Sequence, residues 1–411
     1  MVGEVAGDGW EIPRRKRRDA PHARRTARRD ARGFLAKRLE CAAFPRFLSC
    51  ARWLKKRWVA PKGGLGQAAG VRCLGSCRRL VWVLLLCVAW PRPAALAAAD
   101  GLIVNPRLFF GACNASGAVP VGTNLVLVAD DENNTLRLYR SDMAGLPVKE
   151  YDMDAFLGVR LEGKSLEADL EAGARIGDRA FWIGSHGRNK GGKERSNRHR
   201  FFATDISAVG GEVRVVPVGV PCRSLIEELC RDRRFDRFAF TAAAAKAPKL
   251  RDALNIEGLA ATPEGGLLIG FRNPVPEGRA LLIPLLNPNE VVEGRPARFG
   301  DALLIDLGGL GIRDIALVGR RWVIIAGAWH GGGPFELYFW DGPGTKPKPY
   351  RVKHLGDYQP EAVIVYPDRG LDEFQILSDD GNRVVDGVIS REIPDAARQC
   401  FRGFWVVPNG R

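Results

Sequence analysis

From residue 100 onward, apolar and polar positions recur in the same short arrangement. Each unit has an apolar run, a tight turn containing glycine, and a second run rich in Val, Ile and Leu, which predicts a β-hairpin. One unit spans residues 255–273, with its turn at residues 263–266. Further short apolar runs follow, for example at residues 280–284 and 335–340. Four antiparallel strands that recur about every 50 residues are typical of a β-propeller blade.

Five copies of this unit occur, and each carries a polar residue at the start of its first run. These residues are Ser116, Glu171, Glu257, Asp314 and Glu361. The longest interval between them holds residues 222–254, where Leu225 and Leu229 have helical spacing. We therefore predict an all-β protein, a β-propeller with five blades (six is the alternative) and a helical insertion near residues 222–254. Residues 401–407 and 102–110 are expected to complete one blade together and close the ring.

Polar residues also follow the second run of each unit. In a blade, the start of the first strand and the end of the second lie on one face, close to the axis. The five units therefore bring polar side chains to one rim of the channel, and this convergence predicts a functional surface. The predicted ligand-binding residues are Glu171, His186, Arg188, Glu257, Arg272, Asn273, His330 and Glu361.

Carboxylates that face one channel need compensation, because like charges at short range repel. Arg188, Arg272 and Arg313 can supply it through salt bridges, and a calcium ion with oxygen ligands would supply it more completely. The oxygen-rich residues 130–134 have a suitable composition, although they lack the pattern of the helical calcium loop. Calcium is therefore the cofactor that the sequence suggests, and no catalytic residue is identified. The predicted metal ligands are Asp130, Asp131, Asp314, Asp379 and Asp380.

Other motifs exclude some classes of enzyme. No Gly-x-Ser-x-Gly motif lies between a strand and a helix, which argues against a serine hydrolase. No glycine-rich phosphate loop precedes a helix, which argues against nucleotide binding. The basic, glycine-containing residues 188–200 are either a solvated loop or a loop that grips an anion such as phosphate or an acidic glycan.

The chain before residue 100 has a different composition. Residues 1–99 hold 22 Lys and Arg against 6 Asp and Glu, whereas the remainder holds 40 against 41. The apolar residues 80–90 are fewer than the about 20 that a membrane-spanning helix needs, and small residues follow at 95–99. We predict a signal peptide at residues 79–99, cleaved between Ala97 and Asp100, and hence a periplasmic or secreted protein. Residues 1–78 are either a basic disordered leader or the result of a wrongly assigned start.

The expected product, the β-propeller domain at residues 100–411, is nearly neutral, so the basic charge of the whole chain is no argument for a nucleic-acid partner. After cleavage it has no predicted membrane span, and we expect a monomer whose partner is a ligand or protein at the channel mouth. Four cysteines fall in this part, and an oxidising compartment permits disulfides. The predicted pairs are Cys222–Cys230 and Cys113–Cys400.

Four segments together resemble the uncharacterised bacterial family DUF3616. They are residues 114–140 (NASGAVPVGTNLVLVADDENNTLRLYR), 181–192 (FWIGSHGRNKGG), 255–274 (NIEGLAATPEGGLLIGFRNP) and 360–381. The family has no established activity, so the resemblance implies a fold and little else.

The segment around Glu257 is also similar to a short signature of esterase-like phytase propellers. Glu361 matches that signature as well, whereas Ser116 and Asp314 depart from it. Two functions are therefore open. The first is an exported propeller that binds a ligand or partner at its polar rim. The alternative is a calcium-assisted phosphoester or ester hydrolase that resembles those phytases.

Overall fold

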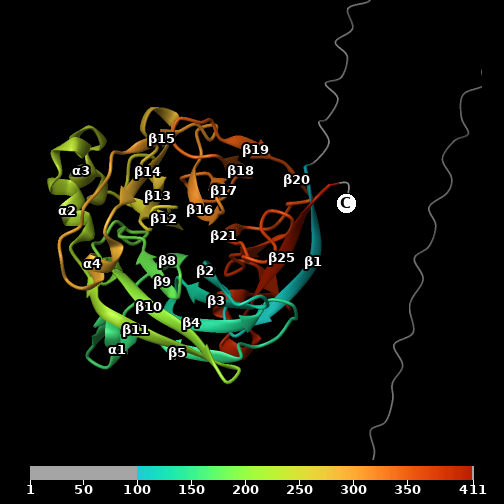
Figure 1. Ribbon diagram of the computed structural model, residues 1–411. Coiled ribbons are helices and arrows are strands. Elements are labelled where there is room, and N and C mark those ends of the chain that lie inside the picture. Colours follow the sequence, from blue (N-terminus) through green and yellow to red (C-terminus); the bar gives the residue numbers. More distant parts are fainter. Residues whose placement is uncertain (1–99, 410–411) are drawn as a thin grey trace, which may run out of the picture. The chain divides into compact units, whose positions relative to one another are not determined.

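The computed structural model describes residues 100–409, so the predicted leader and signal peptide lie outside the described residues. Five sheets are arranged in a ring around a central channel (Figure 1). The innermost strands of the five sheets contact one another in the order β2, β8, β12, β16 and β21. The chain is therefore a five-bladed β-propeller, as the repeated hairpins predicted.

Each of the first four blades is an antiparallel sheet of four strands taken from consecutive parts of the chain. Blade 1 consists of β2 (Ala115–Val121), β3 (Leu125–Asp130), β4 (Asn133–Arg140) and β5 (Lys149–Asp152). Blade 2 consists of β8 (Leu170–Ile176), β9 (Arg179–Gly184), β10 (Phe201–Val209) and β11 (Glu212–Cys222). Blade 3 consists of β12 (Asn255–Ala261), β13 (Leu267–Asn273), β14 (Ala280–Leu285) and β15 (Leu303–Ile305). Blade 4 consists of β16 (Gly311–Val318), β17 (Arg321–Gly327), β18 (Phe335–Trp340) and β19 (Lys348–Tyr350).

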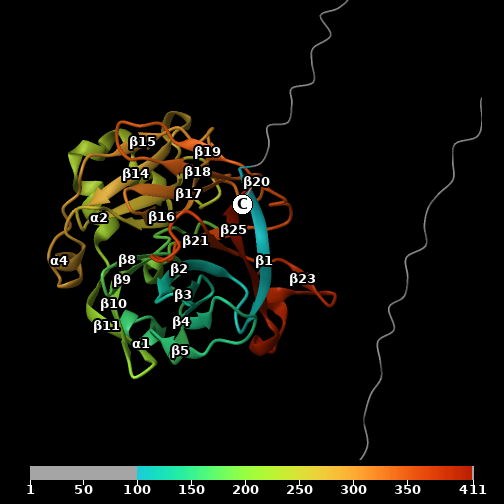
Figure 2. The same ribbon diagram turned by 45° about the vertical axis from the view of Figure 1, so that its right-hand side comes forward.

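Blade 5 joins the two ends of the described chain. From the channel outward it consists of β21 (Pro360–Ile364), β22 (Phe374–Ser378), β25 (Cys400–Pro408), β1 (Gly101–Phe110) and β20 (Val352–Lys353). Strands β1 and β25 run antiparallel, from the pair Gly101 and Pro408 to the pair Phe110 and Cys400. They lie side by side in both ribbon views (Figures 1 and 2). The first and last strands therefore close the ring, as expected.

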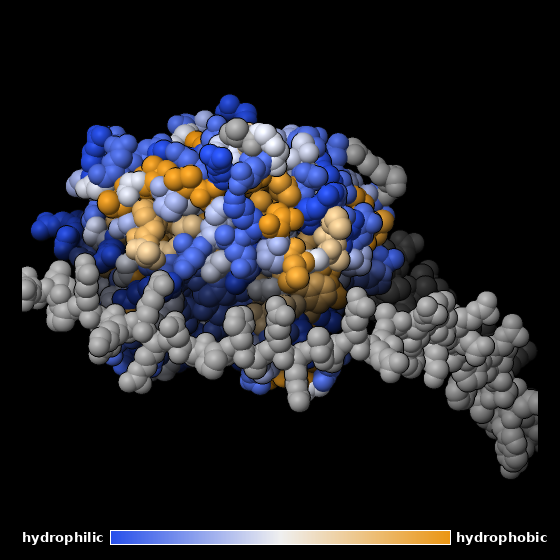
Figure 3. Space-filling view, turned by 90° about the horizontal axis from the view of Figure 1, so that it is seen from below, coloured by the Kyte–Doolittle hydropathy of each residue, from blue (hydrophilic) through white to orange (hydrophobic). Residues whose placement is uncertain are grey.

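Five apolar clusters hold the blades together, one at each interface between neighbouring blades. Between blades 4 and 5, for example, Val323 and Ile325 pack with Phe374, Ile376 and Phe404. A sheet that is covered on both faces needs apolar residues at successive positions rather than alternating ones. This explains why β13 and most of β17 are buried along their length. On the outer surface, apolar side chains lie in separated groups among hydrophilic ones (Figure 3).

The predicted helical insertion is present between blades 2 and 3. It contains α2 (Leu225–Arg231), the 3-10 helix η2 (Arg233–Phe238) and α3 (Phe240–Ala244). Its apolar residues join the cluster between these blades, and the ring centroids of Phe240 and Phe271 lie 5.4 Å apart.

The remaining elements are short and lie between or beside the blade strands. The helices are α1 (Asp154–Leu157), η1 (Ser196–Arg198), η3 (Pro276–Gly278), α4 (Pro288–Val292), η4 (Ser390–Glu392) and η5 (Ala396–Arg398). The strands are β6 (Arg160–Leu161), β7 (Lys164–Ser165), β23 (Val384–Val385) and β24 (Val388–Ile389). Among the described residues, no helix is long and apolar enough to cross a bilayer.

The two predicted disulfides are absent, because all four cysteines of the described part are free thiols. Cys222 ends β11, whereas Cys230 lies at the sixth position of α2. Because an α-helix rises about 1.5 Å per residue, most of α2 lies between these two cysteines. In the other predicted pair, Cys113–Cys400, the backbone carbonyl of Cys400 accepts a hydrogen bond from the Ser390 hydroxyl at 3.3 Å. The Cys113 thiol instead hydrogen-bonds the side chain of Asn114.

Candidate functional site

Each innermost strand has a bulge at an equivalent place near one end of the channel. The pairing register with the second strand shifts across Glu171 in β8, Glu257 in β12, Arg313 in β16 and Glu361 in β21. In blade 1 the shift falls between Ala115 and Ala118. A bulge inserts one extra residue and redirects its side chain. Four charged side chains from four blades are therefore brought to the same end of the channel, which we call the channel mouth.

In blade 4 the register predicted from the sequence is wrong by one residue. Arg313, and not Asp314, occupies the bulged position. Asp314 is buried, and its Oδ2 accepts a hydrogen bond from the Val363 backbone at 2.8 Å. Asp314 therefore joins blade 4 to blade 5 instead of facing the mouth, and burial raises its pKa well above the usual value.

Three of the four bulged residues form ion pairs with one another. Arg313 Nη1 lies 3.0 Å from Glu257 Oε2, and Arg313 Nε donates to Glu361 Oε2 at 2.9 Å. Arg272 Nη1 lies 2.5 Å from the other Glu257 oxygen, which also accepts from Asn255 Nδ2 at 2.6 Å. The side chains of Arg313, Glu257 and Glu361 are all at least nine-tenths buried. The predicted residues Glu257 and Glu361 are therefore held in a buried ion-pair network.

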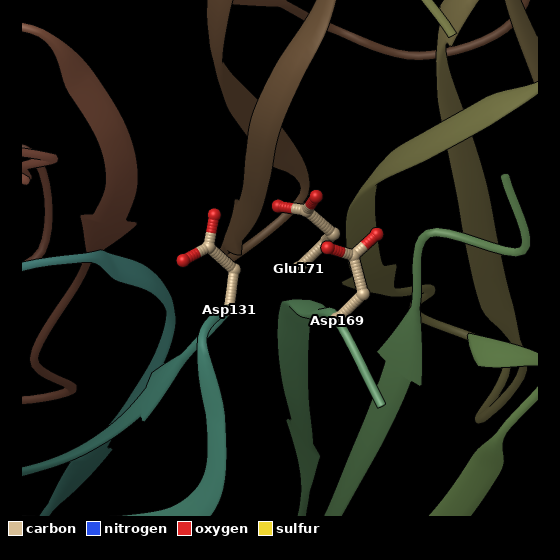
Figure 4. Close-up of side chains that lie close together, drawn as sticks. All are labelled: Asp131, Asp169 and Glu171. Atoms are coloured by element: carbon tan, nitrogen blue, oxygen red, sulfur yellow. The ribbon is translucent and has the colours of Figure 1, made fainter. Parts of the chain in front are cut away.

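Glu171 is the fourth bulged residue and has a different environment. Its carboxylate lies near those of Asp131, in the loop after β3, and Asp169, just before β8, as Figure 4 shows. One carboxylate oxygen from each of the three residues lies within 4.8 Å of the other two. Within residues 100–409, the side chain of Glu171 has no hydrogen bond or ion pair, and the buried Oδ1 of Asp131 has no hydrogen-bond partner. We call Asp131, Asp169 and Glu171 the carboxylate cluster.

The pKa values of the carboxylate cluster are raised. Burial, followed by the charge of Asp169, raises the pKa of Glu171 well above its usual value. Burial, followed by the charge of Glu171, raises the pKa of Asp131 in the same way. Burial raises the pKa of Asp169 to about 7, although the Arg198 guanidinium, 2.7 Å away, opposes this shift. These shifts mean that burial and the mutual repulsion of the carboxylates outweigh the nearby positive charges, which for Glu171 are those of Arg272 and Arg313.

The carboxylate cluster lines a pocket of about 360 Å³ at the channel mouth. Glu132 and Glu167 add two further carboxylates to its wall. Four basic side chains also line it, namely Lys190, Lys249, Arg198 and Arg272, together with the uncharged residues Asn189, Gly191, Pro248 and Asn255. At the opposite end of the channel lies a cavity of about 470 Å³, lined mainly by apolar residues of the five innermost strands. The two ends of the channel therefore differ in chemistry, and only the mouth offers many charged groups.

Two predicted ligand residues, Arg188 and Asn273, bind the backbone of the loops that carry two of these basic side chains. Arg188 Nε donates to the Ala244 carbonyl at 2.8 Å, and its Nη1 donates to the Gly192 carbonyl at 3.1 Å. Asn273 Nδ2 donates to the carbonyls of Pro248 and Leu250 at 2.8 and 2.6 Å. Both side chains are therefore committed to the loops that carry Lys190 and Lys249.

The two predicted histidines do not line this pocket. His186 is buried, with Nδ1 2.8 Å from the Gly184 carbonyl oxygen and its ring stacked beside His199. Burial, followed by the charge of His199, lowers the pKa of His186 to about 3. It borders a separate cavity of about 130 Å³. His330 is exposed, and its Nδ1 contacts the Gly331 carbonyl.

None of the other predicted metal ligands joins the carboxylate cluster, and Asp314 does not face the mouth at all. Asp130 Oδ1 accepts from the Glu132 backbone at 3.0 Å, and burial raises its pKa to about 6. Asp380 forms an ion pair with Arg402 at 2.8 Å. Asp379 accepts from the Gly381 backbone at 2.9 Å, and its charge contributes to the raised pKa of Asp131. Of the five predicted ligands, only Asp131 belongs to the cluster.

Sequence reasoning missed the role of Asp169, although this residue lies within the recognised repeat. Its backbone has a φ of 53°, a left-handed conformation that aspartate tolerates better than most residues. An aspartate two positions before the bulged Glu171 was the available signal. Lys249 also escaped prediction, since its placement depends on the fold of the helical insertion and the segment that follows it.

The fold and its polar mouth define a five-bladed β-propeller. The family model described as "Protein of unknown function (DUF3616)" matches residues 221–366, which confirms the resemblance seen in the sequence over this segment. The comparison with curated proteins finds no match.

Several solved structures are similar in fold. Glutaminyl cyclase from Myxococcus xanthus is 12% identical, with a TM-score of 0.38, over 75% of this chain and 97% of that protein. A putative oxidoreductase (glucose dehydrogenase) from Thermus thermophilus is 12% identical, with a TM-score of 0.37, over 73% and 100%. Virginiamycin B lyase from Staphylococcus aureus is 8% identical, with a TM-score of 0.30, over 74% and 99%. Similarity at this level carries no argument about function.

Proposed function

We propose that the protein binds its ligand at the channel mouth, and that the carboxylate cluster holds a hard divalent cation there, with calcium as the first candidate. The supporting observation is that Asp131, Asp169 and Glu171 offer oxygens within 4.8 Å of one another. Calcium binds oxygen at about 2.3–2.6 Å, so two oxygens on one ion lie at most about 5 Å apart. The spacing of the cluster therefore suits one ion.

The charge balance of the mouth also supports a cation. Arg313 and Arg272 already pair with Glu257, and Arg313 also pairs with Glu361. Arg198 pairs with Glu167 and Asp169. Among the described residues, these contacts leave the Glu171 carboxylate and Oδ1 of Asp131 without a hydrogen-bond or ion-pair partner. Asp131 and Glu171 are partly buried, and Oδ1 of Asp131 fully so; removing a carboxylate from water is costly unless it is paired, and a bound cation would supply the missing partner.

The three carboxylates do not fill the coordination shell of calcium, which takes about six to eight oxygens. The remaining positions would face the mouth pocket and accept water or the oxygens of a ligand. This arrangement supports a binding module more directly than a hydrolase. The hydrolase alternative gains nothing from the comparisons, since the matched family has no known function.

Thermal unfolding of the full chain with and without calcium tests the proposal. A ligand that binds only the folded state stabilises it by about 2.7 kcal/mol at 100 times its Kd, which corresponds to several degrees in Tm for a chain of this size. Calcium should raise the Tm of the wild type. It should not raise the Tm of Asp131→Asn or Glu171→Gln. The control is Glu264→Gln, an exposed residue in the turn of blade 3. An unchanged wild-type Tm in millimolar calcium would refute the cation site.

Export to the periplasm or outside the cell remains part of this proposal. It is supported by the charge difference across residue 100 and by the apolar run at residues 80–90. N-terminal sequencing of the protein from its native source should find a start between residues 98 and 100. A product that begins before residue 79 would refute cleavage at the predicted site.

A further inference from the structure

We infer that the mouth pocket takes a ligand with an oxyanion group, a carboxylate or phosphate, which contacts both the bound cation and the basic wall formed by Lys190, Lys249 and Arg272. This inference rests on the proposed function, because the cation is one of the two contacts. It adds the chemical class of the ligand and assigns a role to the basic loop at residues 188–200.

Within the described residues, the basic wall contains two lysines without an ion pair and one arginine, Arg272, which pairs with Glu257 but keeps one donor without a partner. Lys190 and Lys249 line the pocket and are exposed, and neither has an ion pair with a carboxylate in residues 100–409. Arg272 is only 9% exposed and also lines the pocket, yet its buried Nε–H has no acceptor. Buried donors in proteins almost always have an acceptor. An acceptor supplied by a ligand would satisfy this one.

Both lysines are carried by segments whose backbone is fixed. The Asn189 side chain accepts hydrogen bonds from the backbones of Gly191 and Lys193 at 3.1 and 2.8 Å, which closes a tight turn around Lys190. On the other segment, the Asn273 amide binds the carbonyls on either side of Lys249. The backbone at both lysines is therefore held in place beside the pocket, so only the lysine side chains need to be ordered when an anion binds.

The two kinds of charge in the pocket favour an anion only when the cation is present. Without it, Asp131, Asp169 and Glu171 would repel an anion that approaches the lysines. With a divalent ion bound, the charge of the carboxylate cluster is largely offset, and the ion has open positions for anionic oxygens. An anion can then bridge the ion and the lysines. The volume of about 360 Å³ suits a small molecule or the end of a chain.

Calorimetric titration of the full chain tests the inference in two stages. Calcium is titrated first, and then inorganic phosphate or glucuronate is titrated into the calcium-saturated protein, below the solubility limit of calcium phosphate. The test variant is Lys190→Ala with Lys249→Ala, and the control is Lys164→Ala with Lys346→Ala, which removes two exposed lysines outside the pocket. Arg272 is left unchanged, because its loss would break the pair with Glu257.

We expect at least one of the two anions to bind the calcium-loaded wild type and the control, and to bind the Lys190/Lys249 variant roughly tenfold more weakly. Calcium affinity should change little in either variant. The anion that binds more tightly identifies the oxyanion, phosphate or carboxylate.

Two results would overturn the inference while the proposed function stands. The first is that neither anion binds the calcium-loaded wild type. The second is that the anion affinity is equal in the test and control variants. If calcium itself does not bind the wild type, the proposed function fails and the inference fails with it. A titration of each anion in the absence of calcium should show little binding, and equal binding without calcium would also refute the bridged arrangement.

Discussion

Arg313 in blade 4 places Nη1 3.0 Å from Glu257 Oε2 in blade 3. The same guanidinium donates from Nε to Glu361 in blade 5 at 2.9 Å. One arginine therefore pairs with two of the glutamates that bulged strands bring to the mouth, and Arg272, which pairs with Glu257, supplies the second positive charge. Arg313 is committed to these two residues, and Glu171, the remaining bulged glutamate, has no cation within ion-pairing distance among residues 100–409.

Replacing Arg313 should destabilise the fold strongly. In Arg313→Met, Glu257 and Glu361 lose their shared partner while they remain buried, and breaking a buried pair in this way costs about 3–5 kcal/mol. Urea unfolding measures the loss. The matched control is Arg321→Met, which removes an exposed ion pair with Asp341, the residue directly after β18, and should cost about 1 kcal/mol or less. Equal losses in the two variants would contradict a central role for Arg313.

The pH dependence of stability should reveal the raised pKa of Asp314. Burial raises its pKa in the folded state well above the unfolded value, so the folded state binds this proton more tightly. The contribution of Asp314 is therefore fully present below the unfolded pKa of about 4 and decreases as the pH rises toward the folded pKa. Asp314→Asn keeps an oxygen that can accept from Val363 and has no charge to bury.

We expect Asp314→Asn to be as stable as the wild type or more stable at pH 7, and to show a weaker decrease of stability with rising pH. Urea unfolding at a series of pH values measures both effects. Asp368→Asn, at an exposed turn, serves as the control. A loss above about 1 kcal/mol at pH 7 would show that the charged form of Asp314 is the stabilising one.

Ring closure should depend on Phe109. This side chain of β1 is 1% exposed, and its ring centroid lies 5.2 Å from that of Phe401 and 5.5 Å from that of Tyr139. Phe109→Ala should destabilise by about 3–5 kcal/mol, since it leaves a cavity between blades 5 and 1. The adjacent Leu108 is 36% exposed, so Leu108→Ala should cost much less. Thermal and urea unfolding measure both variants. If Phe109→Ala and Leu108→Ala lose similar stability, the ring would not be closed through the contacts of Phe109 with Phe401 and Tyr139.

The cysteines of the described part should differ in reactivity. Burial raises the pKa of the Cys113 thiol to about 12, and only the thiolate is reactive. Iodoacetamide should therefore modify Cys113 in the native protein far more slowly than after unfolding, as peptide mass spectrometry can measure. Cys222, which is partly exposed, should react sooner. Recovery of a Cys113–Cys400 disulfide-linked peptide would contradict the free thiols of the structure.

The sequence by itself determined the architecture. Hairpins of two apolar runs around a glycine turn predicted the blades, because a sheet packed on both faces needs continuous apolar strands. The polar residues at strand starts predicted a charged channel mouth, and the spacing of Leu225 and Leu229 predicted the helical insertion. These features are local, so they can be recognised without knowing which segments meet.

Only the tertiary structure decided which charged residues face one another. A bulge shifts the strand by one residue, so Arg313 took the place predicted for Asp314, and the alternation of side chains turned Asp314 toward blade 5. The carboxylate cluster joins Asp131 of one blade to Asp169 and Glu171 of the next. Its spacing depends on how neighbouring blades pack, because side chains far apart in the chain acquire a distance only when the ring closes.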